Sequence, residues 1–250
     1  MSSYFAPALL SQFSNLIAAE STRYGGVSVA PFASLNLGIN TDDLPENVDE
    51  NRRRFFKALG VEEYVAGFAS SLQVHGTDVL YAIEAGRYIG YDALITDKPG
   101  LLVGVTVADC VPVLIYDKTN RAVAAVHAGW RGTVGRIVSK TLEAMNHHFG
   151  TKADECYAFV GTCIDECSFE VGPEVSEQFA SEFKRTDPES NKECIDLKGA
   201  NRQQLIEFGI PELQIDVSAF STVLHNDSYF SYRAENGQTG RMLAVIGVRA

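Results

Sequence analysis

The sequence has few of the features that mark membrane, secreted or nucleic-acid-binding proteins. The apolar run LLVGVTVA stops at Asp109, well short of the roughly 18 residues of a membrane helix. No basic residue precedes Arg23, so the positive start of a signal peptide is missing. The net charge of −11 disfavours a general attraction to nucleic acid or anionic membranes. We therefore expect a cytoplasmic protein with a small-molecule partner and with neither a nucleic-acid nor a membrane partner.

Internal repeats, low-complexity tracts and linkers rich in Pro, Gly or Ser are also missing, which favours one domain over residues 1–250. The five cysteines are odd in number and scattered, which indicates thiols rather than disulfides. Cys163 and Cys167 have C-x3-C spacing, unlike the C-x2-C of common zinc modules, and we interpret them as thiols without a metal.

Short β-rich runs dominate the first half of the chain, and several are apolar throughout, as is typical of strands buried on both faces. These runs are FASSLQV (68–74), VLYAI (79–83), DALIT (92–96), LLVGVTVAD (101–109), VPVLIYD (111–117) and AVAAVHA (122–128). Further strands are predicted at CYAFVG, LQIDV, YFSY and MLAVIGV.

Helices are predicted at 47–59, at 134–149 with Thr133 as its N-cap and Gly150 beyond its end, at 173–183 and at 200–208. Because strands and helices alternate unevenly, we predict an α+β (mixed α/β) fold with a mixed sheet flanked by helices.

Three chemically useful residues stand at or near strand ends: His75, Cys110 and His127. A thiolate with two imidazoles is a good zinc set, and three protein ligands with an open fourth position are typical of catalytic zinc. The same residues also fit a Cys110 nucleophile with His127 as its base and Asp109 or His75 as orienter. Each could equally be an ordinary core residue, because gaps of 35 and 17 residues do not define a site.

The stretch AAVHAGWRGT (124–133) ends a strand and places Arg131 in a glycine-flanked turn before a predicted helix. Helix N-termini favour anions, and arginine binds phosphate through paired hydrogen bonds. The alternative is an ordinary surface ion pair.

Eight stretches, read together over nearly the whole chain, resemble the bacterial YfiH-like family, whose members are variously described as purine nucleoside phosphorylases and as multicopper polyphenol oxidoreductase or laccase-like proteins. They are GGVSVAPFASLNLG, NVDENRRRF, LQVHGTDV, DALIT, VADCVPVLIYD, AAVHAGWRGTVGRI, FEVGPEV and YFSYRAENGQTGRML.

The resemblance implies a single α+β domain with a metal, usually zinc, held by His75, Cys110 and His127. It implies phosphorolysis of adenosine, inosine, guanosine and methylthioadenosine, together with adenosine deamination. Copper is also compatible with imidazole and thiolate ligands. We hypothesise a zinc-dependent purine nucleoside phosphorylase with His75, Cys110 and His127 as the catalytic site. The candidate contacts to substrate or phosphate are Asn36, Arg52, Arg131 and Arg233.

Three alternatives stay open: a metal- or cysteine-dependent amidase that edits a muramyl cell-wall precursor, a copper polyphenol oxidase, and a non-enzymatic zinc-binding module. Five histidines are few for a multicopper enzyme. The piece VGTCIDECSFEVG departs from the family pattern at Asp165 and Glu166, which would weaken phosphate binding if their loop lined the pocket. The sequence leaves the oligomeric state open.

Overall fold

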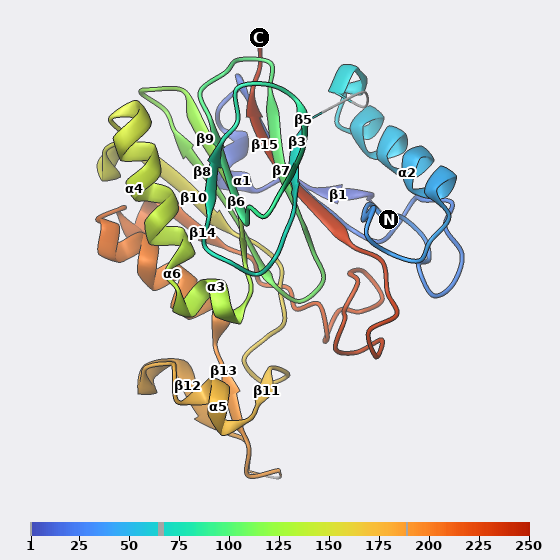
Figure 1. Ribbon diagram of the computed structural model, residues 1–250, viewed down its shortest axis with the longest axis vertical. Coiled ribbons are helices and arrows are strands. Elements are labelled where there is room, and N and C mark those ends of the chain that lie inside the picture. The colour runs from blue at the N-terminus through green and yellow to red at the C-terminus, as the bar shows by residue number, and fades with distance from the viewer. Residues whose placement is uncertain (1, 65–67, 189) are drawn as a thin grey trace.

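Two six-stranded mixed sheets pack face to face in the computed structural model, which describes residues 2–64, 68–188 and 190–250 (Figure 1). The first sheet has the order β1 (Tyr4–Phe5), β2 (Leu16–Ser21), β15 (Met242–Val248), β7 (Leu102–Val107), β3 (Ala69–Leu72) and β5 (Gly86–Ile89). The second has the order β14 (Ile215–Val217), β10 (Cys156–Val160), β8 (Val111–Asp117), β9 (Ala122–Ala128), β6 (Ala93–Thr96) and β4 (Val79–Tyr81). A small third sheet contains β11 (Glu170–Val171), β13 (Glu193–Ile195) and β12 (Lys184–Thr186).

The α-helices are α1 (Ala8–Ser11), α2 (Pro45–Ala58), α3 (Trp130–Val134), α4 (Ile137–Phe149), α5 (Pro173–Ser176) and α6 (Leu197–Phe208). Helices α4 and α6 cover the outer face of the second sheet and α2 that of the first, whereas α1 packs in the cluster between the sheets and α5 packs against β13 of the small sheet. The short 3-10 turns are Glu62–Tyr64, Ala153–Glu155, Ser181–Phe183 and Glu212–Gln214. In the part of the chain that the structure describes, no helix has both the length and the apolar character needed to cross a membrane.

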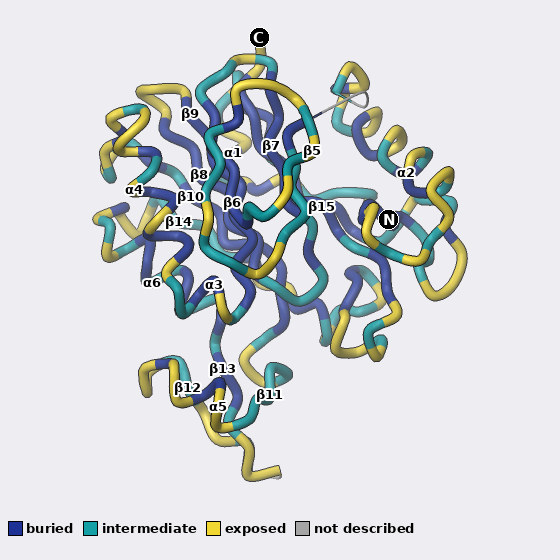
Figure 2. The backbone as a smooth tube through the Cα atoms, viewed as in Figure 1, coloured by how far each residue is buried: buried dark blue, intermediate teal, exposed yellow. Residues whose placement is uncertain are grey.

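The core is layered, and the central strands are buried on both faces (Figure 2). Between the sheets, Leu114 and Val123 of the second sheet pack in one cluster with Val105 and Ile246 of the first. The other face of the second sheet packs against α4 and α6, and the other face of the first packs against α2. Because successive side chains of a strand point to opposite faces, such strands must be apolar throughout.

The predicted mixed α+β class is confirmed, but the expectation of one mixed sheet is wrong because the strands divide between two large sheets. The connection from β3 to β4 crosses from the first sheet to the second, and so does the connection from β7 to β8. His75 lies on the first connection and Cys110 on the second, so both are carried to the junction between the sheets.

Several predicted boundaries also need correction. The helix predicted at 134–149 is interrupted at Arg136, whose left-handed φ of 62° ends α3 and begins α4, so Thr133 lies inside α3 rather than capping a longer helix. The helix predicted at 47–59 begins earlier, with Pro45 in its first turn, where proline is well tolerated. The helix predicted at 173–183 is only the four residues of α5, and α6 starts at Leu197. The strand predicted at YFSY is irregular chain instead.

Glu20 of β2 places an ionisable carboxyl group in the core of the first sheet. Its side chain is fully buried, and both carboxyl oxygens lie within hydrogen-bond distance of the Thr162 N–H. Burial raises the pKa of Glu20 from 4.5 to about 7, because a charged carboxylate is poorly solvated there. The folded state therefore holds a proton that the unfolded chain releases, so stability falls as the pH rises from about 4.5 to 7.

Glu20→Gln should flatten this dependence, because the amide does not ionise. We expect the free energy of unfolding, measured with denaturant at pH 5 and pH 8, to lose about 3 kcal/mol less in the variant than in the parent. Glu143→Gln, at an exposed site on α4, is the control. Equal pH dependence in the parent and Glu20→Gln would show that Glu20 is not the titrating group.

Candidate metal centre

His75, Cys110 and His127 meet where the two large sheets adjoin. Their ligand atoms all lie within 4.8 Å of one another. The two imidazole rings are 4.9 Å apart between centroids and stand at 78° to each other. His75 is exposed, Cys110 is half-buried and His127 is buried at the end of β9. The group is thus open to solvent on the His75 side and closed on the His127 side.

The side chain of Asp92, immediately before β6, organises two of these residues. One carboxylate oxygen accepts the His75 N–H at 3.0 Å and lies 2.7 Å from His127 Nδ1, while the other accepts the N–H groups of Val74 and Gly76 at 3.1 and 2.7 Å. Because an ionised carboxylate only accepts, His127 Nδ1 carries a proton, so Nε2 is the ring nitrogen that could bind a metal. The sequence analysis missed Asp92, although it heads the stretch DALIT.

Glycines in α3 and at its two ends let His75 and the chain after it approach closely. A Cβ atom at Gly129 would lie 2.9 Å from His75 Cδ2 and 3.2 Å from Cys110 Sγ. Gly132 and Gly135 continue the same face and lie against the chain that follows His75. The glycines of HAGWRGTVG, three residues apart, therefore allow close packing around His75 and Cys110.

The electrostatics favour the charged form of the sulfur. Burial would raise the pKa of the Cys110 thiol, but His127 and His75 outweigh this effect and lower it. Burial would lower the pKa of His127, but Cys110 and Asp92 raise it above its ordinary value. Thiolate is the form of cysteine that binds metals.

These residues fit a zinc ion. One sulfur and two imidazole nitrogens form a common zinc donor set, and three protein ligands leave a position for substrate or water. Asp92 is the hydrogen-bonded carboxylate that usually supports a metal-binding histidine. The small Gly129 leaves the space between His75 and Cys110 that the group requires.

A cavity of about 520 Å³ opens on this group, a size typical of small-molecule sites. Its lining residues are Gly38, Asn40, Leu72, Gln73, His75, Thr106, Ala108, Asp109, Cys110, His127, Ile164, Phe169, Tyr232, Arg233 and Arg241. The rings of Phe169 and Tyr232 and the guanidinium groups of Arg233 and Arg241 therefore line the same cavity as the His–Cys–His group.

Both cavity arginines are held by backbone carbonyls. Arg233 donates to the carbonyls of Ser168 and Glu170 at 3.0 and 3.1 Å. Arg241 donates to the two carbonyls at 239 and 240, at 2.7 and 2.9 Å. Within the described ranges, no carboxylate forms an ion pair with either guanidinium. Their positive charge is therefore available to an anion, although the chain as a whole is acidic.

Of the four predicted substrate contacts, only Arg233 lines this cavity. Arg131 is exposed and stacks on Trp130, with 4.3 Å from its guanidinium carbon to the ring centroid. Arg52 donates twice to the Leu37 carbonyl instead of facing the cavity. Arg131 does not line the cavity because α3 is a single short turn, and its N-cap Gly129, rather than its arginine, lies against His75 and Cys110.

Asn36 is fully buried and satisfied within the protein. Its side chain donates to Thr41 and Asp43 and accepts the N–H groups of Gly38 and Arg241. It therefore positions Arg241, the cavity arginine that the sequence analysis missed, rather than touching a ligand. Arg241 lies in the stretch NGQTGRML, which is part of the resemblance to the family.

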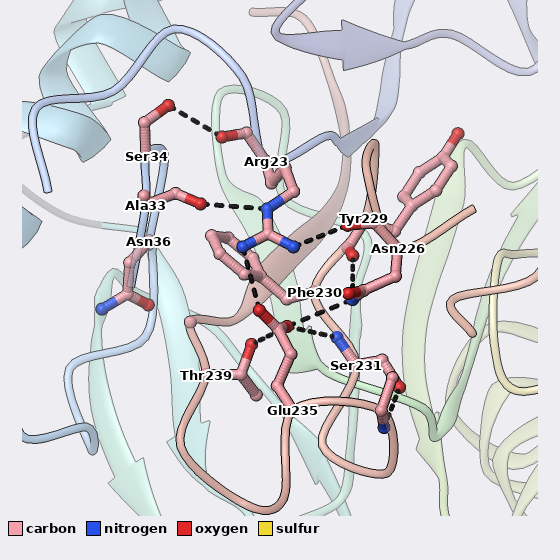
Figure 3. A network of polar contacts seen from close by, with 12 residues as sticks. Arg23, Ala33, Ser34, Asn36, Asn226, Tyr229, Phe230, Ser231, Glu235 and Thr239 are labelled. Atoms are coloured by element: carbon pink, nitrogen blue, oxygen red, sulfur yellow. Dashed lines mark hydrogen bonds and ion pairs between the residues drawn. The ribbon is translucent and has the colours of Figure 1, made fainter. Parts of the chain in front are cut away.

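The loop that carries Tyr232 and Arg233 is tied to the first sheet by the ion pair of Arg23 and Glu235, which are 3.0 Å apart (Figure 3). Arg23 also donates to the carbonyls of Ala33 and Asn226. A segment after β2 and the loop before β15 thus meet in this network, which fixes one wall of the cavity.

Asp165 and Glu166, the departure from the family pattern, do not line the cavity. Asp165 accepts the N–H groups of Cys167 and Ser168 and the hydroxyl of Ser221. Glu166 pairs with Arg185 at 3.3 Å. The expected weakening of phosphate binding by acids facing the pocket therefore has no basis in this geometry.

Comparison with known proteins agrees with the fold. The family described as multi-copper polyphenol oxidoreductase laccase matches residues 17–249, and the chain belongs to this family. A Bacteroides thetaiotaomicron protein named purine nucleoside phosphorylase is 37% identical, with 95% of this chain and 93% of that protein covered. A Deinococcus radiodurans protein of the same name is 40% identical, with 92% and 88% covered. The crystal structure of YlmD from Geobacillus stearothermophilus has a TM-score of 0.92 at 30% identity, covering 100% of this chain and 97% of that one.

Asp92→Asn should weaken zinc binding about 10- to 100-fold, because the amide no longer fixes the tautomer of His127 as a carboxylate does. Competition with a chromophoric chelator measures the affinity. Asp97→Asn is the matched control, since Asp97 accepts a hydrogen bond from the Tyr81 hydroxyl and does not contact the His–Cys–His group. An Asp92→Asn protein with the affinity of the parent would exclude this role.

Gly129→Ala should also reduce zinc affinity, by on the order of 10-fold, because the new methyl group displaces the His75 ring or the Cys110 sulfur. Gly86→Ala, whose added Cβ would lie 3.8 Å from its nearest neighbours, should bind zinc as the parent does. The same titration tests both variants, and an unchanged affinity at Gly129→Ala would contradict the close packing.

Proposed function

We propose that the protein is a zinc-dependent purine nucleoside phosphorylase that also deaminates adenosine. One observation carries the proposal: a His–Cys–His group, two aromatic rings and two arginines line the same cavity of about 520 Å³, and among the described residues no carboxylate forms an ion pair with either arginine. The names of the relatives at 37% and 40% identity support the phosphorylase assignment. The substrates we propose are adenosine, inosine, guanosine and methylthioadenosine, with phosphate.

His75, Cys110 and His127 would hold the metal, and Asp92 would orient His127. A zinc ion bound there supplies positive charge that polarises a substrate oxygen or lowers the pKa of water. Imidazole and thiolate ligands also accept copper. The family description names several coppers, but the described residues contain one three-residue group of this kind.

The chain's own residues suit nucleoside and phosphate. The rings of Phe169 and Tyr232 offer flat apolar surfaces to a purine. Arg233 and Arg241 offer guanidinium N–H groups to phosphate oxygens. In phosphorolysis a phosphate oxygen bonds the anomeric carbon while the bond to the purine breaks and the base leaves with the electron pair. Holding the two reactants side by side in one cavity would supply much of the acceleration that this step needs.

Hydrolysis of an amide is the second candidate. Cys110 lies beside His127, and His127 lies beside Asp92, which is the spatial order of a nucleophile, its base and the group that orients the base. A muramyl cell-wall precursor is the substrate class we propose for that alternative. Loss of activity on thiol alkylation together with resistance to chelators would favour it. Sensitivity to chelators would favour the metal.

Chromatographic product analysis with adenosine, on protein of known zinc and copper content, tests the proposal. We expect adenine only when phosphate is present, inosine without phosphate, and neither product from Cys110→Ala. No turnover by fully metallated protein, or full turnover by Cys110→Ala, would contradict the phosphorylase assignment.

Arg241→Gln should raise the KM for phosphate about 10- to 100-fold, because a charge-assisted hydrogen bond is lost. Arg131→Gln is the matched control, since Arg131 lies outside the cavity. Initial rates at varied phosphate concentration measure the effect. A larger change in Arg131→Gln than in Arg241→Gln would reverse the assignment of the phosphate contact.

A further inference from the structure

Two cysteines apart from Cys110, namely Cys167 and Cys194, lie close together at the small sheet β11–β13–β12, which projects from the body of the molecule (Figure 1). Cys167 is exposed, and Cys194 of β13 is buried beneath it with 2% of its surface accessible. The Cys194 Sγ lies 3.7 Å from the carbonyl oxygen of Cys167. The site and the proposed activity use neither thiol.

The backbone distance places the two side chains within reach of each other. A carbonyl oxygen lies about 2.4 Å from its own Cα, so the Cys194 sulfur is at most about 6 Å from the Cys167 Cα. A cysteine sulfur lies about 2.8 Å from its own Cα, so a turn of the Cys167 side chain can bring its sulfur to within about 3 Å of Cys194 Sγ, close to the sulfur–sulfur bond length of about 2.05 Å. A rotation of the exposed Cys167 side chain, with a small adjustment of its turn, can therefore bring the sulfurs into bonding distance.

Exposure makes Cys167 the member of the pair that an oxidant in solution can reach, and Arg185 of β12 lies beside it. Its guanidinium lies 3.3 Å from Cys167 Sγ, and Arg185 is the residue directly opposite Cys194 in the pairing of β12 with β13. A neighbouring guanidinium favours negative charge on a sulfur, which is the form that attacks oxidants. The buried Cys194 has its pKa raised by burial, so it is suited to react second.

We propose that Cys167 and Cys194 form a reversible disulfide when a hydroperoxide oxidises Cys167. The Cys167 thiolate attacks one peroxide oxygen, the O–O bond breaks, and the product is a sulfenic acid with release of water or an alcohol. The Cys194 thiol then loses its proton and its sulfur attacks the Cys167 sulfur, which releases a second water. Two thiols are oxidised by two electrons in total, and the hydroperoxide is reduced.

The disulfide would fix one wall of the cavity. Cys167 is directly followed by Ser168, whose carbonyl holds Arg233, and then by Phe169, whose ring lines the cavity. The turn is already anchored by Asp165, which accepts the Cys167 N–H at 2.8 Å. Oxidation at Cys167 would thus be transmitted to the ligand cavity over two residues.

The test treats reduced, zinc-loaded protein with hydrogen peroxide and maps its peptides without reduction. We expect a peptide pair joined through Cys167 and Cys194, lighter by two hydrogens and separated again by a thiol reductant. Cys167→Ser should abolish the link, and Cys163→Ala, at the other cysteine of the C-x3-C pair, should leave it. In Cys194→Ser, a cyclic diketone should trap sulfenic acid at Cys167.

Arg185→Gln should slow formation of the link about two- to fivefold, as the loss of one exposed neighbouring charge predicts. Absence of a Cys167–Cys194 link in the parent, or a link from Cys167 to another cysteine, would overturn the proposal. These readouts do not involve turnover, so the proposal can stand or fail independently of the proposed enzymatic activity.

Discussion

The Asp92 carboxylate is the constraint on which the rest of the site depends. It gathers three consecutive backbone N–H groups, from Val74 to Gly76, and the Nδ1 of His127 around one buried pair of oxygens. The contacts with these groups hold the pKa of Asp92 below its ordinary value, although burial acts in the opposite direction. A single charge thus fixes the turn that presents His75, whose φ is 59°, and the orientation of His127.

The fold brings the remaining parts to this carboxylate. Two connections between the large sheets carry His75 and Cys110 to their junction, and the end of β9 supplies His127. Asp109, beside Cys110, accepts hydrogen bonds from Thr222, Ser231 and the Arg233 backbone, so the connection that bears the sulfur also holds the far wall of the cavity. The site is shared by segments distant in sequence, and its integrity depends on the whole fold.

The sequence could predict what depends on local pattern. Apolar runs identified the central strands. Residue type and position at strand ends made His75, Cys110 and His127 candidates, and the family resemblance joined them into one ligand set. Pattern could not say which sheet a strand joins, because strands buried on both faces look alike in either sheet. Nor could it separate Arg131 from Arg241: both follow glycine-rich turns, and only the tertiary contacts of Asn36 and the short α3 decide which one faces the cavity.

X-ray absorption spectroscopy at the zinc edge, with the metal content of the same sample, tests the central claim most directly. The account predicts one zinc ion per chain, bound by one sulfur and two imidazole nitrogens, and loss of the sulfur signal in Cys110→Ser. A site with two or more sulfur ligands, or zinc bound without sulfur in the parent protein, would contradict it. Either result would separate the metal from the group that Asp92 organises.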